Sequence, residues 1–182
     1  KKGVFMEKQI SFKSRARLMP QIGDQLIKNE SIALLELVKN AYDADAPDVW
    51  VEMWDIDKSD KGKIIVKDNG DGMDLSIVEN SWMEIGTDNK KNLLDEYIMN
   101  DKKSALGRLP MGEKGIGRFG VHKLGSKITL ITRMKGKKEV VVKIDWTSFE
   151  KFDYLEQVPI TVIERNPEYF TGDSYFQKGC RG

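Results

Sequence analysis

The segment from residue 31 to residue 44 constrains the fold of this chain more than any other. Its apolar residues recur at spacings of three, four and seven, the pattern of a helix with one buried face. These residues are Leu34, Leu37, Val38 and Ala41. Ser31 is expected to cap the helix at its start, and Pro47 prevents it from continuing far. The segment therefore predicts an amphipathic helix that packs against another element.

A second stripe on the same helix is polar. Glu36, Asn40 and Asp43 are separated by four and then three residues, so they share one face. Such a stripe is typical of a solvated helix surface. Amide and carboxylate oxygens are also the ligands that Mg²⁺ prefers, and a carboxylate one turn away is suited to deprotonating a water. The residues alone leave both interpretations open.

A glycine-containing turn follows a strand expected at residues 63–67. It reads Asp68-Asn69-Gly70-Asp71-Gly72, and Asn-Gly and Asp-Gly are common in ordinary turns. Alternatively, the glycines allow the backbone to approach a flat ligand, while the Asp68 carboxylate accepts a hydrogen bond from it.

A third motif, from Gly112 to Gly120, contains Gly115-x-Gly117-x-x-Gly120. It lacks the Gly-Lys-Ser/Thr of a Walker loop, and no strand precedes it, so it is not a dinucleotide-binding fingerprint. It is expected to open a helix near residues 116–124. Free N–H groups at such a start bind phosphate, and Lys114 adds a positive charge there.

The remaining pattern predicts one α+β domain: a two-layer sandwich with a mixed, mostly antiparallel sheet and helices on one face. Strands are expected at residues 7–14, 49–54, 63–67, 126–134, 139–146 and 158–164, with a hairpin turn at 135–138. Helices are expected at residues 15–28 and 31–44, and Asp74 is expected to cap a short helix that ends at Trp82. The polar segment 86–113 has no clear periodicity, which is typical of a functional lid.

The order and spacing of the three motifs resemble the GHKL ATPases. That family includes DNA gyrase B, the ninety-kilodalton heat-shock chaperones, histidine kinases and MutL-type repair proteins. The resemblance covers about residues 12–146 and looks nearest to the bacterial heat-shock chaperones. Residues 36–46, 68–73 and 112–120 look like the family's three boxes. The resemblance implies a Bergerat-type ATP-binding fold over residues 1–182, with a lid at about 86–113.

The resemblance also implies roles for individual residues. Glu36 would be the general base for water, Asn40 the Mg²⁺ ligand, and Asp43 a pocket residue near the nucleotide. Asp68 would accept from the adenine amino group, and the base would lie along Gly70, Gly72 and Met73. The phosphates would be held by Lys114 and the loop residues Gly115, Ile116, Gly117, Arg118, Phe119 and Gly120. Thr87 lies in a segment similar to the start of the family's lid.

Two family features are not visible in this sequence. The last box, a Gly-Thr on a late strand, has only Gly179 or Gly182 as candidate remnants. The lysine that many members insert from a following domain would lie beyond residue 182. These gaps favour an ATP-binding domain excised from a longer protein, with weak turnover. A binding module without turnover and a histidine-kinase-type domain remain alternatives to a hydrolase. The Glu-x-x-x-Asn form of the first box favours the hydrolase.

Composition restricts the setting and the partners. The formal net charge is +1, which implies no general attraction to nucleic acid or membrane. No apolar run reaches the roughly 20 residues of a membrane helix. The single cysteine, Cys180, favours a reducing compartment, hence the cytoplasm. ATP with Mg²⁺ is the expected ligand, and ATP-dependent self-association is expected of the full-length protein; a client or nucleic-acid partner is left undecided. The lone His122 is expected to be structural.

Overall fold

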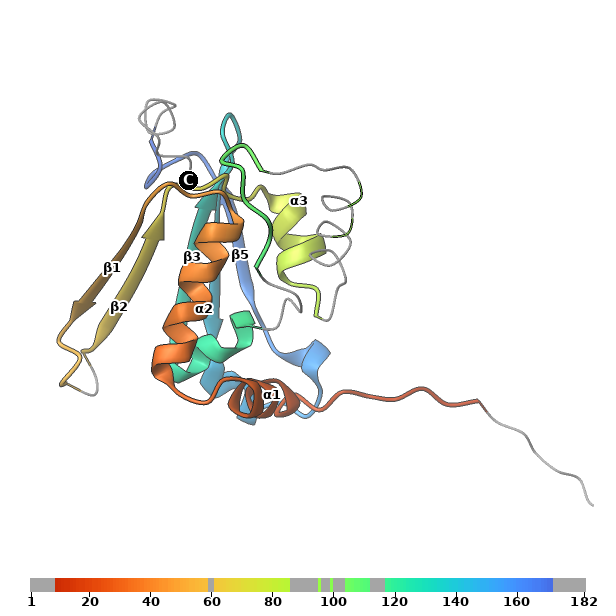
Figure 1. Cartoon of the computed structure of the whole chain (residues 1–182). Helices are drawn as coiled ribbons and strands as arrows, with labels where there is room; N and C mark the ends of the chain where they lie inside the picture. Colours follow the sequence, from red (N-terminus) through yellow and green to blue (C-terminus); the bar gives the residue numbers. More distant parts are fainter. Residues whose placement is uncertain are drawn as a thin grey trace, which may run out of the picture.

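The computed structural model describes residues 9–58, 61–85, 95, 99, 104–111 and 117–171, with backbone only at residues 118 and 119. Its main regular elements are two helices, a two-stranded hairpin and a three-stranded sheet (Figure 1). None of its helices is long and apolar enough to cross a membrane. The helices and antiparallel strands confirm the predicted α+β class.

Helix α2 (Glu30–Asp43) is the helix predicted from the apolar repeat. The prediction that Ser31 caps it is wrong, because Ser31 lies inside the first turn. Asn29 has the extended backbone of an N-cap, and its Oδ1 accepts a hydrogen bond from the N–H of Ile32 at 3.0 Å. Helix α1 (Leu18–Leu26) precedes it, and Pro20 is tolerated there because it lies in the first turn.

Strands β1 (Val49–Trp54) and β2 (Lys63–Asp68) form an antiparallel hairpin in the predicted positions. The buried Asn69 side chain fastens its open end: Oδ1 accepts from the N–H of Asp48 at 2.8 Å, and Nδ2 donates to the Asp48 carboxylate at 3.0 Å. The end of β2, and therefore the turn that follows it, is fixed next to the start of β1.

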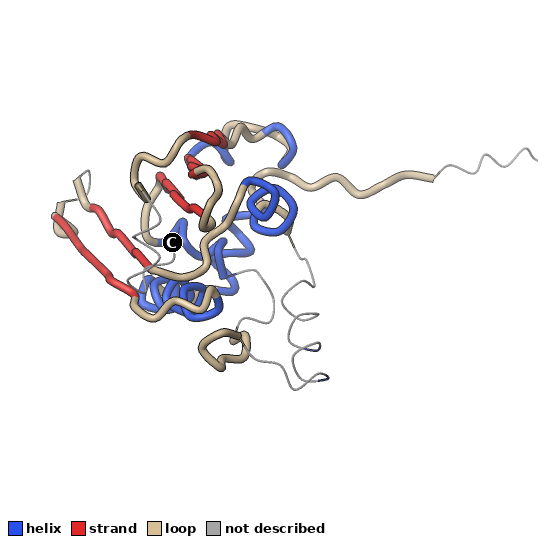
Figure 2. Tube along the Cα trace, turned by 90° about the horizontal axis from the view of Figure 1, so that it is seen from above, coloured by secondary structure: helices blue, strands red, loops and turns tan. Residues whose placement is uncertain are grey.

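Strands β3 (Lys127–Arg133), β4 (Glu139–Asp145) and β5 (Thr161–Arg165) form the second antiparallel ladder. A turn at Met134–Lys138 joins β3 to β4, with Gly136 at φ 74°, which confirms the predicted hairpin. The single expected sheet is instead two ladders among the described strands, because β2 pairs with β1 and β3 pairs with β4. Seen from above, the β1–β2 hairpin stands apart from the other three strands (Figure 2).

The hydrophobic core lies on one face of the β3–β4–β5 sheet. Val140, Val142 and Ile144 of β4 pack there with Met19, Val78, Trp146 and Phe149. Val78 belongs to the helical segment made of α3 (Leu75–Ile77) and the π-helical turn η1 (Val78–Trp82), which Asp74 caps as predicted. The 3₁₀ turns η3 (Trp146–Glu150) and η4 (Leu155–Gln157) close the lower end of this core.

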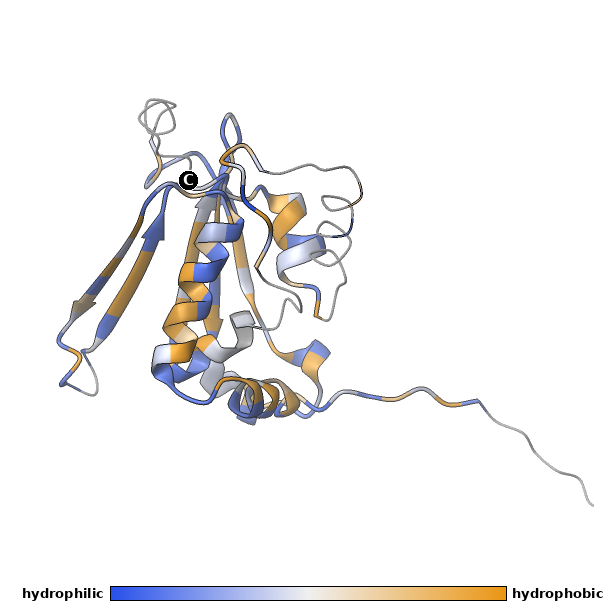
Figure 3. Cartoon of the chain, in the orientation of Figure 1, coloured by the Kyte–Doolittle hydropathy of each residue, from blue (hydrophilic) through white to orange (hydrophobic). Residues whose placement is uncertain are grey.

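The apolar stripe of α2 is less deeply buried than its sequence predicts. Of the four residues assigned to it, Ala41 is buried, whereas Leu34, Leu37 and Val38 are half-buried. The hairpin also leaves apolar side chains exposed, including Trp50, Met53 and Trp54. Figure 3 shows this apolar character along α2 and along both strands of the hairpin.

The prediction of a strand at residues 7–14 is wrong for residues 9–14, and residues 7 and 8 lie outside the described part. This segment forms no strand, and Ile10 and Phe12 are exposed. An isolated bridge between Arg15 and Tyr154 and a hydrogen bond from the N–H of Leu155 to the carbonyl of Ser14 join the segment's end to the chain near η4. An alternating pattern predicts strand character but does not supply a neighbouring edge to pair with.

A buried ionic cluster holds the upper end of the three-stranded sheet. Glu139 is fully buried and accepts from Arg165 at 2.8 Å and from the N–H groups of Tyr169 and Phe170 at 2.8 and 2.9 Å. Arg133 on the neighbouring strand donates to the Phe170 carbonyl at 2.8 Å. Burial alone would raise the pKa of Glu139, but hydrogen bonds from Phe170, Arg165 and Tyr169 outweigh it and hold the pKa below its ordinary value of 4.5.

We expect Glu139→Gln to lower the free energy of unfolding by about 2–4 kcal/mol, because the amide places an NH₂ against backbone donors and removes the buried one of the two carboxylates that pair with Arg165, leaving only the exposed Glu168. Urea unfolding followed by tryptophan fluorescence measures this. Glu164→Gln is the matched control: its contact with Lys138 is 3.4 Å long and exposed, so its loss costs less than about 0.5 kcal/mol.

The difference in free energy of unfolding between wild type and Glu139→Gln is expected to have its full size above pH 4.5. It is expected to shrink as pH falls through the lowered pKa of Glu139, since the wild-type carboxylate then becomes protonated. Equal destabilisation by Glu139→Gln and Glu164→Gln would contradict the assignment of Glu139 as a structural anchor.

Candidate functional site

The polar stripe of α2 carries the predicted base and the predicted metal ligand. Glu36 Oε1 accepts from Lys39 Nζ at 2.9 Å, and the two side chains are only 24% and 28% exposed. Asn40 follows one turn later with an exposed side chain. Lys39 lies within the predicted pocket motif but was given no role, although its i+3 spacing from Glu36 is a recognisable ion-pair signal. The pair holds the carboxylate in one orientation.

Gly117 brings the third motif against the first. A Cβ built on Gly117 would lie 2.3 Å from Glu36 Oε2, so the backbone of the glycine-rich motif touches the carboxylate directly. Gly117 begins the 3₁₀ segment η2 (Gly117–Lys123), where a helix was predicted. Any side chain at this position displaces the Glu36 carboxylate. The structure therefore joins two motifs that lie 81 positions apart in the sequence.

The turn after β2 lies at the carboxyl end of α2. Asp68 Oδ1 accepts from the N–H of Gly70 at 2.9 Å, and the N–H of Asp71 donates to the carbonyl of Ala44 at 2.8 Å. Burial raises the pKa of Asp68 above its ordinary value of 3.8, and the hydrogen bond from Gly70 offsets this only in part. A half-buried acceptor next to a tight turn is suited to reading one donor group on a ligand.

Gly72 and Met73 fix the turn onto β3. Gly72 has φ 66°, and a Cβ there would lie 2.1 Å from the carbonyl oxygen of Arg133, so only glycine fits. The N–H of Met73 donates to Thr132 Oγ1 at 2.9 Å, while the Met73 side chain packs against the core. Thr132 was not predicted, since a partner 59 positions away leaves no local signal.

Two other predicted residues have structural partners. Asp43 Oδ1 accepts from the N–H of Met111 at 2.7 Å, so the carboxylate contacts the segment before the glycine-rich motif. Gly120 is buried against Ile27, where a Cβ would lie 2.2 Å from Cγ1, so close packing explains this glycine. The expectation that either contacts nucleotide stays a prediction.

The rest of the predicted phosphate loop lies outside the described residues: Lys114, Gly115 and Ile116, together with the side chains of Arg118 and Phe119. Thr87, predicted at the start of the lid, also lies outside them. The lid expected at about residues 86–113 is described only at residues 95, 99 and 104–111. Residues 104–111, however, have a defined position at the end of α2.

The donor set on α2 suits Mg²⁺ that arrives with a nucleotide. No group of three or more Asp, Glu, His or Cys residues within the described ranges could hold a metal by itself. Mg²⁺ commonly uses one or two protein oxygens and takes its other ligands from phosphates and water. The exposed amide of Asn40, one turn from the Glu36 carboxylate, fits that requirement.

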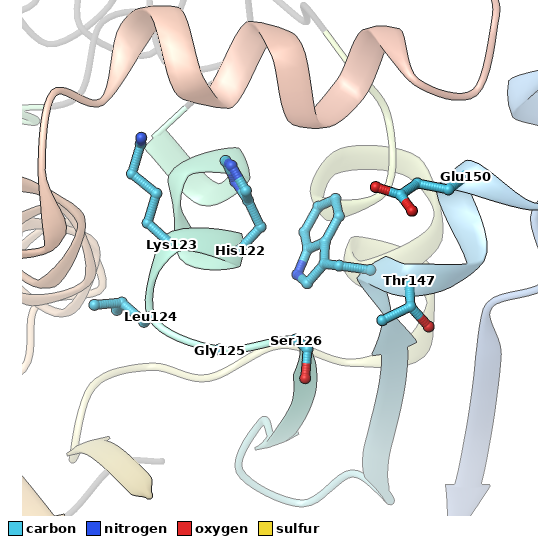
Figure 4. A pocket seen from close by; sticks show the side chains of 8 residues that line it. His122, Lys123, Leu124, Gly125, Ser126, Thr147 and Glu150 are labelled. Atoms are coloured by element: carbon cyan, nitrogen blue, oxygen red, sulfur yellow. The ribbon is translucent and has the colours of Figure 1, made fainter. Parts of the chain in front are cut away.

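An open hollow elsewhere contains none of the predicted site residues. It lies between the end of η2 and η3 and is lined by His122, Ser126, Trp146 and Glu150 (Figure 4). His122 Nε2 lies 3.0 Å from Asp24 Oδ1, and its ring packs against Trp146. These contacts tie α1 to η2 and η3, which agrees with the structural role expected of His122.

Known proteins are similar to this chain over most of its length. The family model described as histidine kinase-, DNA gyrase B-, and HSP90-like ATPase matches residues 28–173. The chaperone protein HtpG of Streptomyces coelicolor is 30% identical over 141 residues, and that of Rhodococcus jostii is 29% identical over 150. These matches cover 74% and 72% of this chain but only 21% and 23% of the chaperones. The three motifs and the extent of the family match lead to one conclusion: this chain belongs to the histidine kinase-, DNA gyrase B- and HSP90-like ATPases.

Proposed function

We propose that this chain binds ATP with Mg²⁺ and hydrolyses it, and that the hydrolysis acts as a conformational switch in a longer protein. The observation that carries the proposal is the contact of the Gly117 backbone with the Glu36 carboxylate. This contact brings Gly117 of the glycine-rich motif against Glu36, one turn before Asn40 on α2, which supports a shared role of the two motifs in one site.

Adenine recognition is assigned to Asp68. The N–H of Gly70 occupies Oδ1, so the adenine amino group is expected at Oδ2. The hydrogen bonds from Asp71 to Ala44 and from Met73 to Thr132 hold the turn between α2 and β3. A fixed acceptor favours adenine over guanine, which carries a carbonyl oxygen in place of that amino group.

Hydrolysis is assigned to Glu36. Its carboxylate takes the proton of the attacking water, while Lys39 keeps the carboxylate oriented through the 2.9 Å contact at Oε1. Asn40 would hold the Mg²⁺ ion, whose chemistry is to neutralise the phosphate oxygens. The backbone N–H groups of the glycine-rich motif bind the phosphates.

The proposal extends to the cellular compartment and to the assembly of the full-length protein. The single Cys180 favours the cytoplasm, and the likeness to part of the HtpG chaperones favours ATP-dependent self-association of the full-length protein. Two alternatives remain: a nucleotide-binding module without turnover in isolation, and a domain that transfers phosphate to a histidine. Phosphate release in water without an acceptor protein supports hydrolysis over both.

We expect Glu36→Gln to retain ATP affinity within about threefold and to lower phosphate release by about 10²–10⁴-fold, because the amide keeps the shape of the side chain but accepts no proton. Isothermal titration measures binding, and a phosphate-release assay measures turnover. Glu30→Gln is the matched control, since Glu30 lies exposed in the first turn of the same helix. Unchanged turnover in Glu36→Gln would exclude Glu36 as the base.

We expect Asp68→Asn to weaken ATP binding by about 10–100-fold, the effect of losing one charge-assisted hydrogen bond. With Oδ1 still bound to Gly70, the new amide turns a donor toward the adenine amino group. Equal affinity of the two proteins for ATP in isothermal titration would contradict the placement of adenine.

The same substitution is expected to leave the unliganded protein equally stable or more stable at pH 7. Burial raises the pKa of Asp68, so the ionised wild-type side chain costs folding free energy once pH rises through that raised value. In urea unfolding, any excess in free energy of unfolding of Asp68→Asn over wild type is therefore expected to vanish as pH falls through the raised pKa of Asp68 toward 3.8. A loss of both binding and stability would indicate a purely structural aspartate.

A further inference from the structure

Residues 104–111 run past the carboxyl end of α2, at the upper end of that helix in Figure 1. We call this segment the strap. It has no helix or strand of its own, yet its hydrogen bonds reach four residues at or just beyond the end of α2. The sequence predicted only an irregular lid here.

Asp45 is the central anchor of the strap. Its side chain is 3% exposed, Oδ1 accepts from Ser104 Oγ at 2.6 Å, and Oδ2 accepts from the N–H of Leu106 at 3.0 Å. Its backbone has φ 60°, a left-handed conformation that Asp tolerates better than most residues. Ser104 Oγ in turn accepts from the N–H of Arg108 at 2.9 Å. Both carboxylate oxygens of Asp45 are therefore used to hold the strap.

Arg108 and Met111 attach the strap at two further points. Arg108 Nη1 donates to the carbonyl of Ala46 at 2.7 Å, and its guanidinium lies 4.6 Å from the centre of the Tyr42 ring. A cation at this position also complements the negative end of the helix dipole. The N–H of Met111 donates to Asp43 at 2.7 Å.

The strap ends where the glycine-rich motif begins. Met111, beside Asp43, directly precedes Gly112, and Gly117, beside Glu36, lies near the motif's other end. Asp43 and Glu36 are seven residues apart on α2, which is about 10 Å along a helix. Met111 and Gly117 therefore both contact the polar stripe that includes Asn40.

We propose that Asp45 is a positioning residue for the triphosphate end of the site: by anchoring the strap to the end of α2, it fixes where the glycine-rich motif starts relative to Asn40 and Glu36. This inference rests on the proposed ATP-binding function. Asp45 touches no ligand in this account and acts only through the strap. Adenine recognition depends on the separate attachment of the turn to Ala44 and Thr132, so it is independent of Asp45.

The anchoring itself is tested without nucleotide. Trypsin cleavage after Arg108, followed by mass spectrometry, is expected to become at least about tenfold faster in Asp45→Ala, because loss of the anchor frees the strap. Asp55→Ala is the matched control: Asp55 also has positive φ, at 49°, but lies exposed in the turn of the hairpin. Equal cleavage rates in the two variants would overturn the anchoring.

The coupling to phosphate is tested by isothermal titration of ATP and AMP. We expect Asp45→Ala and Ser104→Ala to weaken ATP binding by about tenfold and to leave AMP binding unchanged, because AMP lacks the β- and γ-phosphates. An equal change for both ligands, or none, would overturn the positioning role. Ser104→Ala removes one partner at a half-buried position, so it remains informative if Asp45→Ala unfolds. If the wild-type protein binds neither ATP nor AMP, while Asp45→Ala is still cleaved faster than wild type, the proposed function is refuted and the strap anchor stands.

Discussion

The candidate site depends on the carboxyl end of α2. The carbonyl groups of residues that directly follow a helix are not used by the helix itself, so they can accept from other segments. Here the carbonyl of Ala44 accepts from the turn that carries Asp68, and the carbonyl of Ala46 accepts from Arg108 of the strap. The side chains of Asp43 and Asp45 accept from the same strap. One helix end therefore sets the relative positions of the predicted adenine acceptor and the predicted phosphate-binding motif.

A second fixed point lies on the three-stranded sheet. Gly72 packs directly on the backbone of Arg133, and the neighbouring Thr132 accepts from Met73. Arg133 is held through the Phe170 carbonyl, and Phe170 is held by the buried Glu139. The Asp68 turn is thus clamped between a helix and a sheet, although the hairpin that leads into it belongs to a separate ladder. This clamp gives the half-buried Asp68 a fixed direction.

Local patterns in the sequence predicted the elements well. The apolar repeat predicted α2, partial alternation predicted β1, and a β-branched apolar run predicted β2, with the glycine-containing turn at its end. Contacts between distant segments were not predictable in the same way. Asp45 reads as an ordinary residue after a helix, and its partner Ser104 lies 59 positions away in a stretch without periodicity. The cap at Asn29 was missed because Ser31 is an equally suitable residue type, and only the backbone conformation distinguishes them.

The central claim is that α2, the Asp68 turn and the glycine-rich motif form one ATP site. A crystal structure of the protein with Mg²⁺ and a non-hydrolysable ATP analogue tests it most directly. We predict that the adenine amino group lies within hydrogen-bonding distance of the Asp68 carboxylate. The triphosphate is expected to lie along the Glu36–Asn40 face of α2, next to Gly117. Nucleotide bound instead in the hollow between His122 and Trp146, or adenine turned away from Asp68, would contradict it.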